Sequence, residues 1–230
     1  MDKRDSLKMF FWVKLLISIR QNIKTILSNY LKMKEYFIPL IFYLITAPII
    51  NWLFKDYTIA LIVKFLVVVI LLALFRKAYP LKFRISWESI FAGIFIFIVW
   101  VGLQGRYPEL GGSSANVPLG VIQTSLRVII LIVLAPIIEE YFTRYFLNRY
   151  LQKAKWQRVP IGKFTVFSFI FTVLFFGFSH SQWLPGLIAG IALNILLMRR
   201  KNIHECITAH AIANACLVVY ILYTGSTVFW

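Results

Sequence analysis

Long apolar segments, separated by short polar or basic stretches, dominate the pattern of this chain. Each is close to the roughly 20 residues that a helix needs to cross a bilayer. The pattern therefore predicts an all-α fold, a polytopic transmembrane helix bundle of about seven spans (six to eight). We place the spans at residues 36–54, 58–75, 87–104, 118–140, 164–180, 184–198 and 205–225.

The first 35 residues follow a different pattern, in which apolar and basic positions alternate. They contain neither an uninterrupted apolar core nor a small-residue cleavage site, so they do not read as a secretory signal. We predict an amphipathic helix that lies on the membrane surface. The expected organisation is a basic amphipathic segment at 1–35 and a transmembrane domain at 36–230, without an internal repeat or second domain.

Composition supports a membrane protein, because 60% of the 230 residues are hydrophobic and only 15% are charged. Soluble domains have about 45–50% apolar and about 25% charged residues. The formal net charge of +16 is compatible with nucleic-acid binding. However, the basic residues fall in short clusters between apolar segments, which is typical of cytoplasmic loops. We therefore expect the lipid bilayer as a partner and no nucleic acid.

The basic clusters also predict the orientation of the chain. Of the 25 Lys and Arg residues, 21 fall on one side of an alternating topology. The positive-inside rule then predicts a cytoplasmic N-terminus, in a plasma membrane whose composition suits a bacterium. Lys64 and Arg127 fall inside predicted spans, and we expect their side chains to reach the outer interface by snorkelling.

Two adjacent acids, Glu139 and Glu140, end an apolar run. An ionisable group inside lipid costs roughly 2.5–3.5 kcal/mol on insertion scales, so the pair needs a reason. Arg144 follows Glu140 by four residues, about 40° around a helix, which predicts a structural ion pair. Glu139 lies about 140° from Arg144 and is left free to act. The alternative is a pair of solvated acids at a helix end.

Histidine and asparagine side chains provide further polar groups within apolar segments. His180 ends one apolar run, and His210 lies in the last span with Asn214 on the same helix face. We expect His180, His210 and Asn214 to converge with the glutamates. His204 lies near the interface and is expected to be solvated.

A zinc protease helix is not indicated, because His204 and His210 are six residues apart and the H-E-x-x-H motif needs four. A zinc site built from Glu139, His180 and His210 is chemically permitted. The prediction is nevertheless a site with no metal and no cofactor.

Three short patterns now stand in order on separate spans. Together they resemble the signature of the CAAX-protease and bacteriocin-processing (CPBP, or Abi) family of intramembrane glutamic endopeptidases. The resemblance covers about residues 118–220, and the N-terminal half resembles the family only in being transmembrane. Members often have an aromatic residue before the arginine and glycine after it, whereas this chain has Thr143 and Tyr145. The patterns are Glu139-Glu140-x-x-x-Arg144, Phe176-x-x-x-His180 and His210-x-x-x-Asn214.

The resemblance implies metal-free hydrolysis of a peptide bond. Glu139 would be the general base, and His180 would orient the water. His210 and Asn214 would stabilise the oxyanion. Glu140 belongs to the catalytic set, and Arg144 supports it. The implied substrate is a peptide or membrane-anchored protein, such as a prenylated or leader-bearing precursor.

Two other functions stay open on the sequence. One is a non-catalytic bacteriocin immunity or membrane scaffold protein on the same fold, since a fold does not prove chemistry. The other is a small proton-coupled transporter, because buried Glu and His also serve proton relays. A transporter predicts duplicated halves with broken helices, and no such symmetry is visible.

One geometric conflict remains in the predicted topology. His180 lies 17 residues beyond Lys163, roughly 25 Å along a straight helix and near the outer side. Glu139 is drawn toward the cytoplasmic half. The two meet only if the fifth span starts deeper, tilts or breaks, or if Glu139 lies nearer the middle of the membrane. Gly177, Gly186 and Gly190 are expected to leave room for a water-filled cavity.

Overall fold

The computed structural model describes residues 3–82, 84–110, 119–226 and 229. Between residues 3 and 29, only the side chains of Lys14 and Arg20 are described. Helices account for 77% of the chain, and no strand occurs in the described ranges. The predicted all-α class is confirmed.

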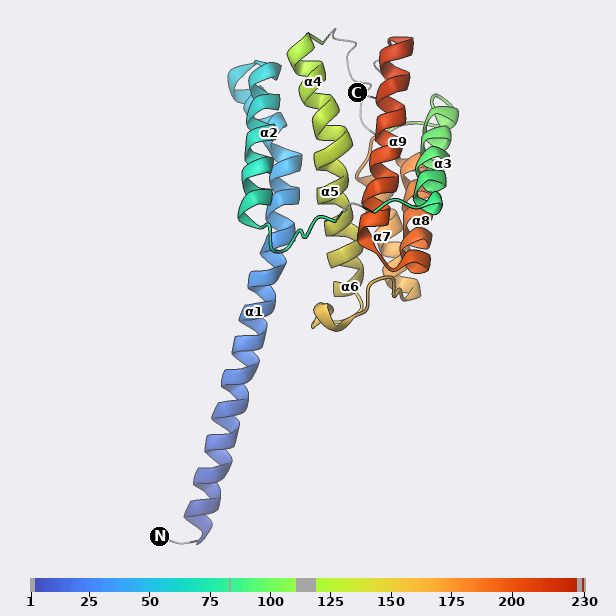
Figure 1. The fold of residues 1–230 in the computed structure, drawn as a ribbon. Coiled ribbons are helices and arrows are strands. Elements are labelled where there is room, and N and C mark those ends of the chain that lie inside the picture. The colour runs from blue at the N-terminus through green and yellow to red at the C-terminus, as the bar shows by residue number, and fades with distance from the viewer. Residues whose placement is uncertain (1–2, 83, 111–118, 227–228, 230) are drawn as a thin grey trace. The chain divides into compact units, whose positions relative to one another are not determined.

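The helices follow one another along the chain, with a long connection between α2 and α3 (Figure 1). Four consecutive elements, η1, α5, η2 and α6, continue α4 without a break, so that Val121–Tyr150 is one helix of 30 residues. The bounds are α1 Lys3–Phe54, α2 Tyr57–Leu74, α3 Trp87–Leu103, α4 Val121–Ile129, η1 Ile130–Leu134, α5 Ala135–Glu140, η2 Tyr141–Leu147, α6 Asn148–Tyr150, η3 Trp156–Arg158, α7 Val166–Phe178, α8 Trp183–Arg200 and α9 Ile203–Thr224.

The chain divides into two compact units, Met1–Glu35 and Tyr36–Trp230, and α1 runs through both. In the first unit the described backbone is helical from Lys3, as predicted. Its placement at a membrane surface stays a prediction. The second unit holds every other helix and the candidate site.

Five helices are long and apolar enough to cross a membrane, by length and composition. Two shorter apolar helices, Trp87–Leu103 and Val166–Phe178, bring the set to the predicted seven segments. The protein is therefore a multi-pass membrane protein, as the apolar pattern indicated. The five long segments are Tyr30–Phe54, Tyr57–Leu74, Val121–Tyr150, Trp183–Arg200 and Ile203–Thr224.

The fourth predicted span ends ten residues too early, at 140 rather than Tyr150. The helix continues because Arg144 is neutralised from within it by Glu140, and the neighbouring aromatic side chains are buried. The fifth segment is shorter than predicted, Val166–Phe178. It starts at Thr165, whose side chain accepts a hydrogen bond from the Ser168 N–H and caps the helix.

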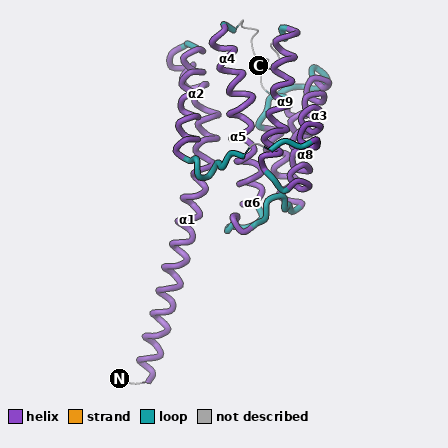
Figure 2. The backbone as a smooth tube through the Cα atoms, in the orientation of Figure 1, coloured by secondary structure: helices purple, strands orange, loops and turns teal. Residues whose placement is uncertain are grey.

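Helices α3 and α9 pack side by side (Figure 2). Helices α7 and α8 also pack closely. A Cβ on Gly177 would lie 2.4 Å from Leu187 Cδ2, and one on Gly186 would lie 3.0 Å from the Gly177 Cα. Gly190 likewise faces the backbone of Val173 at 3.2 Å. The expectation that these glycines leave room for a cavity is wrong. They bring two helices together, and none of the three is among the described residues that line the cavity.

Candidate active site

A cavity of about 330 Å³ lies among the helices of the second unit. Helices α1, α2, α3, α7, α8 and α9 line it, together with the 30-residue helix and the turn between α7 and α8. All three predicted motifs contribute to it. Its titratable lining side chains, among the described residues, are Tyr43, Lys64, Glu139, His180 and His210.

The 30-residue helix is wound irregularly on both sides of the glutamates. Two segments, Ile130–Leu134 and Tyr141–Leu147, have π-helical hydrogen bonding, and Ala135 donates to the Ile130 carbonyl five residues back. Such insertions are rare and are frequent at functional sites. The hydrophobic pattern did not predict them.

Pro136 explains how the last helix is joined to this irregular segment. In the π-helical register the Leu131 carbonyl would accept the N–H of residue 136, and proline has none. Asn214 of α9 takes its place, with Nδ2 donating to the Leu131 oxygen at 2.7 Å. Asn214 also lines the cavity. One of its two amide protons is therefore structural, and the other is available to the cavity.

Glu140 holds two partners in a fully buried cluster. Arg144 Nη1 and His210 Nδ1 both lie 2.9 Å from Glu140 Oε1, and the side chains of Glu140 and Arg144 are 0% exposed. The predicted ion pair is confirmed, and the contact with His210 was not foreseen. Glu140 is not among the described residues that line the cavity. Glu140 contacts Nδ1 of His210, and His210 itself lines the cavity. The geometry therefore supports a positioning role for Glu140 and not direct contact with a substrate.

Glu139 and His180 face each other in the cavity. Glu139 Oε2 lies 3.7 Å from His180 Nε2, and their side chains are 15% and 24% exposed. That oxygen is buried and has no hydrogen-bond partner among the described residues. His180 Nδ1 lies 2.7 Å from the Phe176 carbonyl, which can only accept. Nδ1 therefore carries a hydrogen, and Nε2 is the ring nitrogen that faces Glu139.

The predicted conflict between the positions of Glu139 and His180 is resolved by the helix bounds. Glu139 is the nineteenth residue of the 30-residue helix and lies well inside it. Helix α7 has only 13 residues, so it covers roughly 20 Å where the prediction assumed a longer span. Both features reduce the separation that the prediction assumed, and the depth of each residue in the membrane stays a prediction.

The ring of Phe176 lies between the buried Glu140 cluster, which it meets at Arg144 and His210, and His180. The Arg144 guanidinium lies over it, 4.2 Å from the ring centroid. The rings of His180 and His210 lie with their centroids 4.8 and 5.7 Å away. A cation on an aromatic face is stabilised when water is excluded, which helps to keep Arg144 in place.

His204 departs from its predicted solvated position. It is half-buried, with Nε2 2.6 Å from the Pro80 carbonyl and Nδ1 3.0 Å from Asn202 Oδ1. The Tyr141 hydroxyl donates to the same Pro80 carbonyl at 2.7 Å. His204 is drawn from solvent because the loop after α2 needs donors for its carbonyl groups. It ties that loop to α9, outside the cavity.

The residues do not form the permitted zinc site. Among the described residues, no group of three or more His, Cys, Asp and Glu side chains is placed to hold a metal ion. His210 Nδ1 is already held by Glu140.

The sequence did not predict that the N-terminal helices α1 and α2 line the cavity. Lys64 lines the cavity, with its ammonium 3.9 Å from the centroid of the Tyr43 ring. The expectation that Lys64 snorkels to the outer interface is therefore wrong. Trp100 of α3 packs edge-on against His180, with ring centroids 5.4 Å apart. The sequence signal for this role was the position of Lys64 inside an apolar span. Such a lysine either snorkels to the interface or serves a functional site.

Comparison with known protein families gives one match. Residues 121–216 match the family described as type II CAAX prenyl endopeptidase Rce1-like. No curated protein and no solved structure matches this chain. The matched region contains all three motifs, so the predicted resemblance to the CAAX-protease (CPBP, Abi) family is confirmed there.

Proposed function

Because residues 121–216 match a family of CAAX proteases, we propose that this protein is an intramembrane endopeptidase that cleaves by glutamate-activated water and without a metal. The observation that carries the proposal is the pair formed by Glu139 and His180. A carboxylate oxygen without a hydrogen-bond partner among the described residues lies 3.7 Å from an imidazole nitrogen, inside a cavity.

That separation suits a water molecule that donates one hydrogen to each group. Glu139 accepts one proton, and His180 Nε2 accepts the other hydrogen bond and orients the oxygen. His180 is itself fixed by its Nδ1–H donation to the Phe176 carbonyl. The water oxygen therefore has a defined direction before a substrate carbonyl arrives.

The reaction follows from these positions. Glu139 takes a proton from the water as its oxygen bonds to the carbonyl carbon, which gives a tetrahedral oxyanion. Glu139 then returns the proton to the amide nitrogen as the carbon–nitrogen bond breaks. The products are a carboxylic acid and an amine, and the second proton of the attacking water is released when the acid ionises.

His210 and Asn214 are the donors for the oxyanion in this proposal. The Nδ1–H of His210 is directed at the anionic Glu140, so Nε2 carries a hydrogen only when the ring is an imidazolium. Asn214 contributes the amide proton that Leu131 does not use. Fixed donors in a site with little water stabilise developing charge better than mobile solvent does. Glu140 and Arg144 are positioning residues.

The substrate in this proposal is a membrane-associated peptide, with a prenylated or leader-bearing precursor as the leading class. The transmembrane domain at 36–230 would carry the catalytic core, and residues 1–35 would lie on the membrane surface. We place the protein in a bacterial plasma membrane with the N-terminus in the cytoplasm, because the basic residues of the loops cluster on that side.

The test compares purified parent protein with Glu139→Gln and with Glu88→Gln, a control at an acid outside the cavity. Each is incubated with prenylated and leader-bearing peptides, with and without a chelator, and products are identified by mass spectrometry. We expect Glu139→Gln to lower the rate about 100- to 10,000-fold, which is the usual contribution of a general base. The control should cleave as the parent does, and chelation should change neither.

Loss of cleavage on chelation would overturn the metal-free mechanism. Cleavage by Glu139→Gln at the parental rate would remove Glu139 as the base. If no peptide is cut and bacteriocin immunity is unchanged in the Glu139→Gln variant, the non-catalytic immunity or scaffold function replaces the protease.

A further inference from the structure

Two titratable side chains that line the cavity, among the described residues, have no task in the proposed mechanism. They are Lys64 and its neighbour Tyr43. Lys64 is the eighth residue of α2, an apolar helix whose other residues carry no charge. Both Lys64 and Tyr43 lie outside the family-matched region 121–216. The match therefore assigns them no role.

The Lys64 ammonium is held by an aromatic ring, with the charge of Glu139 near enough to act on it. Its Nζ lies over the ring of Tyr43, 3.9 Å from the centroid. Tyr43 is buried, and its hydroxyl faces the carboxylate of Glu139. Lys64 forms no ion pair with any described carboxylate, Glu139 included. An aromatic face keeps an ammonium in a fixed position without neutralising it.

The arginine side chains near the cavity have other neighbours. Arg144 pairs with Glu140. Arg127 lies over the ring of Tyr57, 5.5 Å from its centroid, and is not among the described residues that line the cavity. Lys64 is thus the cation that a negatively charged ligand of this cavity would meet.

We propose that Lys64, positioned by Tyr43, forms a subsite that binds a carboxylate of the substrate peptide, close to the bond that is cut. The inference rests on the proposed function, because Lys64 and Glu139 line one cavity. At about 330 Å³ the cavity is at the lower end of the roughly 300–1,000 Å³ of small-ligand sites, so it takes a short peptide segment. The carboxylate is either the chain terminus or an acidic side chain a few residues from the scissile bond.

The experiment uses full-length parent, Lys64→Met and Lys55→Met. Methionine keeps the length and apolar character of the lysine stem and removes its charge. Lys55 is the matched control, because it is an exposed lysine over an aromatic ring, 5.9 Å from Trp52, and does not line the cavity. Three prenylated peptides serve as substrates. The first ends in Asn with a free terminal carboxylate, and the second is its carboxamide. The third is the same carboxamide with Asp in place of that Asn.

We expect the parent to prefer a carboxylate peptide over the uncharged carboxamide by about tenfold or more in kcat/KM. Preference for the first peptide identifies a terminal carboxylate, and preference for the third identifies a side chain. The preference should fall to about one in Lys64→Met and persist in Lys55→Met. An unchanged preference in Lys64→Met overturns the subsite. An equal loss on all peptides also overturns it, because Lys64 would then serve Glu139 instead.

Binding separates this inference from the proposed function. Fluorescence anisotropy of the same labelled peptides is measured on Glu139→Gln, with and without Lys64→Met. Carboxylate-dependent binding that needs Lys64, together with a parent protein that cuts none of the peptides, keeps the subsite and removes the protease. Equal binding of charged and uncharged peptides removes the subsite, whatever the cleavage result.

Discussion

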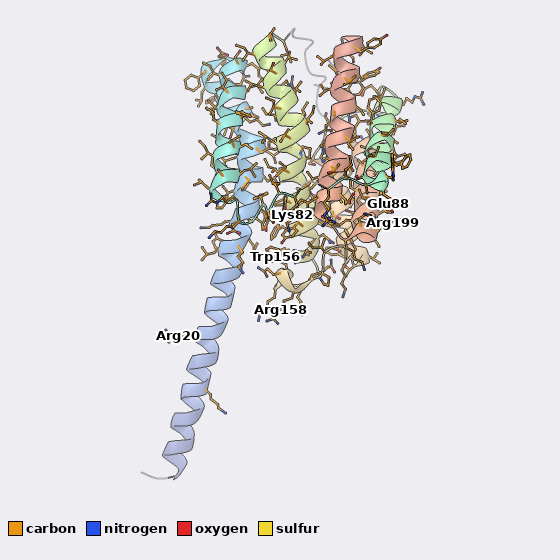
Figure 3. All side chains as sticks on the ribbon, in the orientation of Figure 1. Arg20, Lys82, Glu88, Trp156, Arg158 and Arg199 are labelled. Atoms are coloured by element: carbon orange, nitrogen blue, oxygen red, sulfur yellow. The ribbon has the colours of Figure 1, made fainter. Side chains whose placement is uncertain are left out.

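Two clusters of opposite charges in this protein use the same side-chain types in different surroundings. Glu140, Arg144 and His210 are buried between the 30-residue helix and α9. The second cluster lies at the α8–α9 turn, where Figure 3 labels Glu88 and Arg199. There Arg199 Nη2 lies 3.1 Å from Glu88 Oε1, and Arg199 is 68% exposed.

The distances in the two clusters are similar, so distance alone does not rank them. In water, an ion pair loses most of its attraction to screening and to the entropy of two long side chains. In the interior, the same pair is costly to disrupt, because a charge is left without a partner. Burial, more than the distance between the charged atoms, therefore distinguishes the ion pair that the site depends on.

The largest expected effect comes from breaking the buried pair. Arg144→Met leaves Glu140 with His210 alone, and we expect it to lower the free energy of unfolding by about 3–5 kcal/mol. Arg199→Met removes an exposed partner of Glu88 and should cost about 0–1 kcal/mol. Urea unfolding in detergent, followed by tryptophan fluorescence, measures both. Equal costs for the two variants would abolish the distinction between the clusters.

Two uncharged amide side chains, Asn214 and Asn194, allow a second contrast between a residue at the cavity and one outside its lining. Asn214→Ala removes the donor to the Leu131 carbonyl and a proposed oxyanion donor. Asn194→Ala removes a buried donor to Thr172 Oγ1 at 3.0 Å, away from the cavity. Each should lower stability by about 1–3 kcal/mol. Only Asn214→Ala should also lower kcat, by about 100- to 1,000-fold.

Cleavage assays at a temperature where both amide variants are fully folded separate the two effects. If Asn194→Ala loses as much activity as Asn214→Ala, the loss is a general consequence of weakened packing. Asn214 would then have no special place in the chemistry.

The smallest expected effect concerns packing without charge. Gly177→Ala places a Cβ 2.4 Å from Leu187 Cδ2, and overpacking of this kind costs about 1–3 kcal/mol. Gly102→Ala places its Cβ where no atom lies within 4 Å, in the last turn of α3. It should be neutral or stabilise by up to about 1 kcal/mol. The same unfolding assay gives both values, and a neutral Gly177→Ala would show that α7 and α8 can separate at no cost.

Much of the fold could be predicted because lipid imposes simple requirements. A helix must be apolar over the width of the bilayer, so the seven segments were visible as runs of residues. Polar groups inside such runs are costly, which brought Glu139, His180, His210 and Asn214 to attention. The structure places all four around one cavity.

The missed features depend on contacts between distant parts of the chain. The helix that carries the glutamates continues to Tyr150 because its interior arginine has a partner, which hydropathy does not record. Lys64 was assigned to the interface because snorkelling explains most single lysines in spans. Its actual neighbour, Tyr43, is 21 residues away in another helix. The π-helical turns likewise depend on packing against α9.

The bond from Asn214 to Leu131 has a consequence for how the protein is assembled. Among the described helices α9 is synthesised last, after the helix that contains Leu131, Pro136 and Glu140 is already in the membrane. Until α9 arrives, that helix has a carbonyl without its donor, and the carboxylate of Glu140 lacks His210. The packing of α9 satisfies both groups and brings His210 and Asn214, the two proposed oxyanion donors, to the cavity together. A chain that stops short of α9 therefore lacks this half of the candidate site.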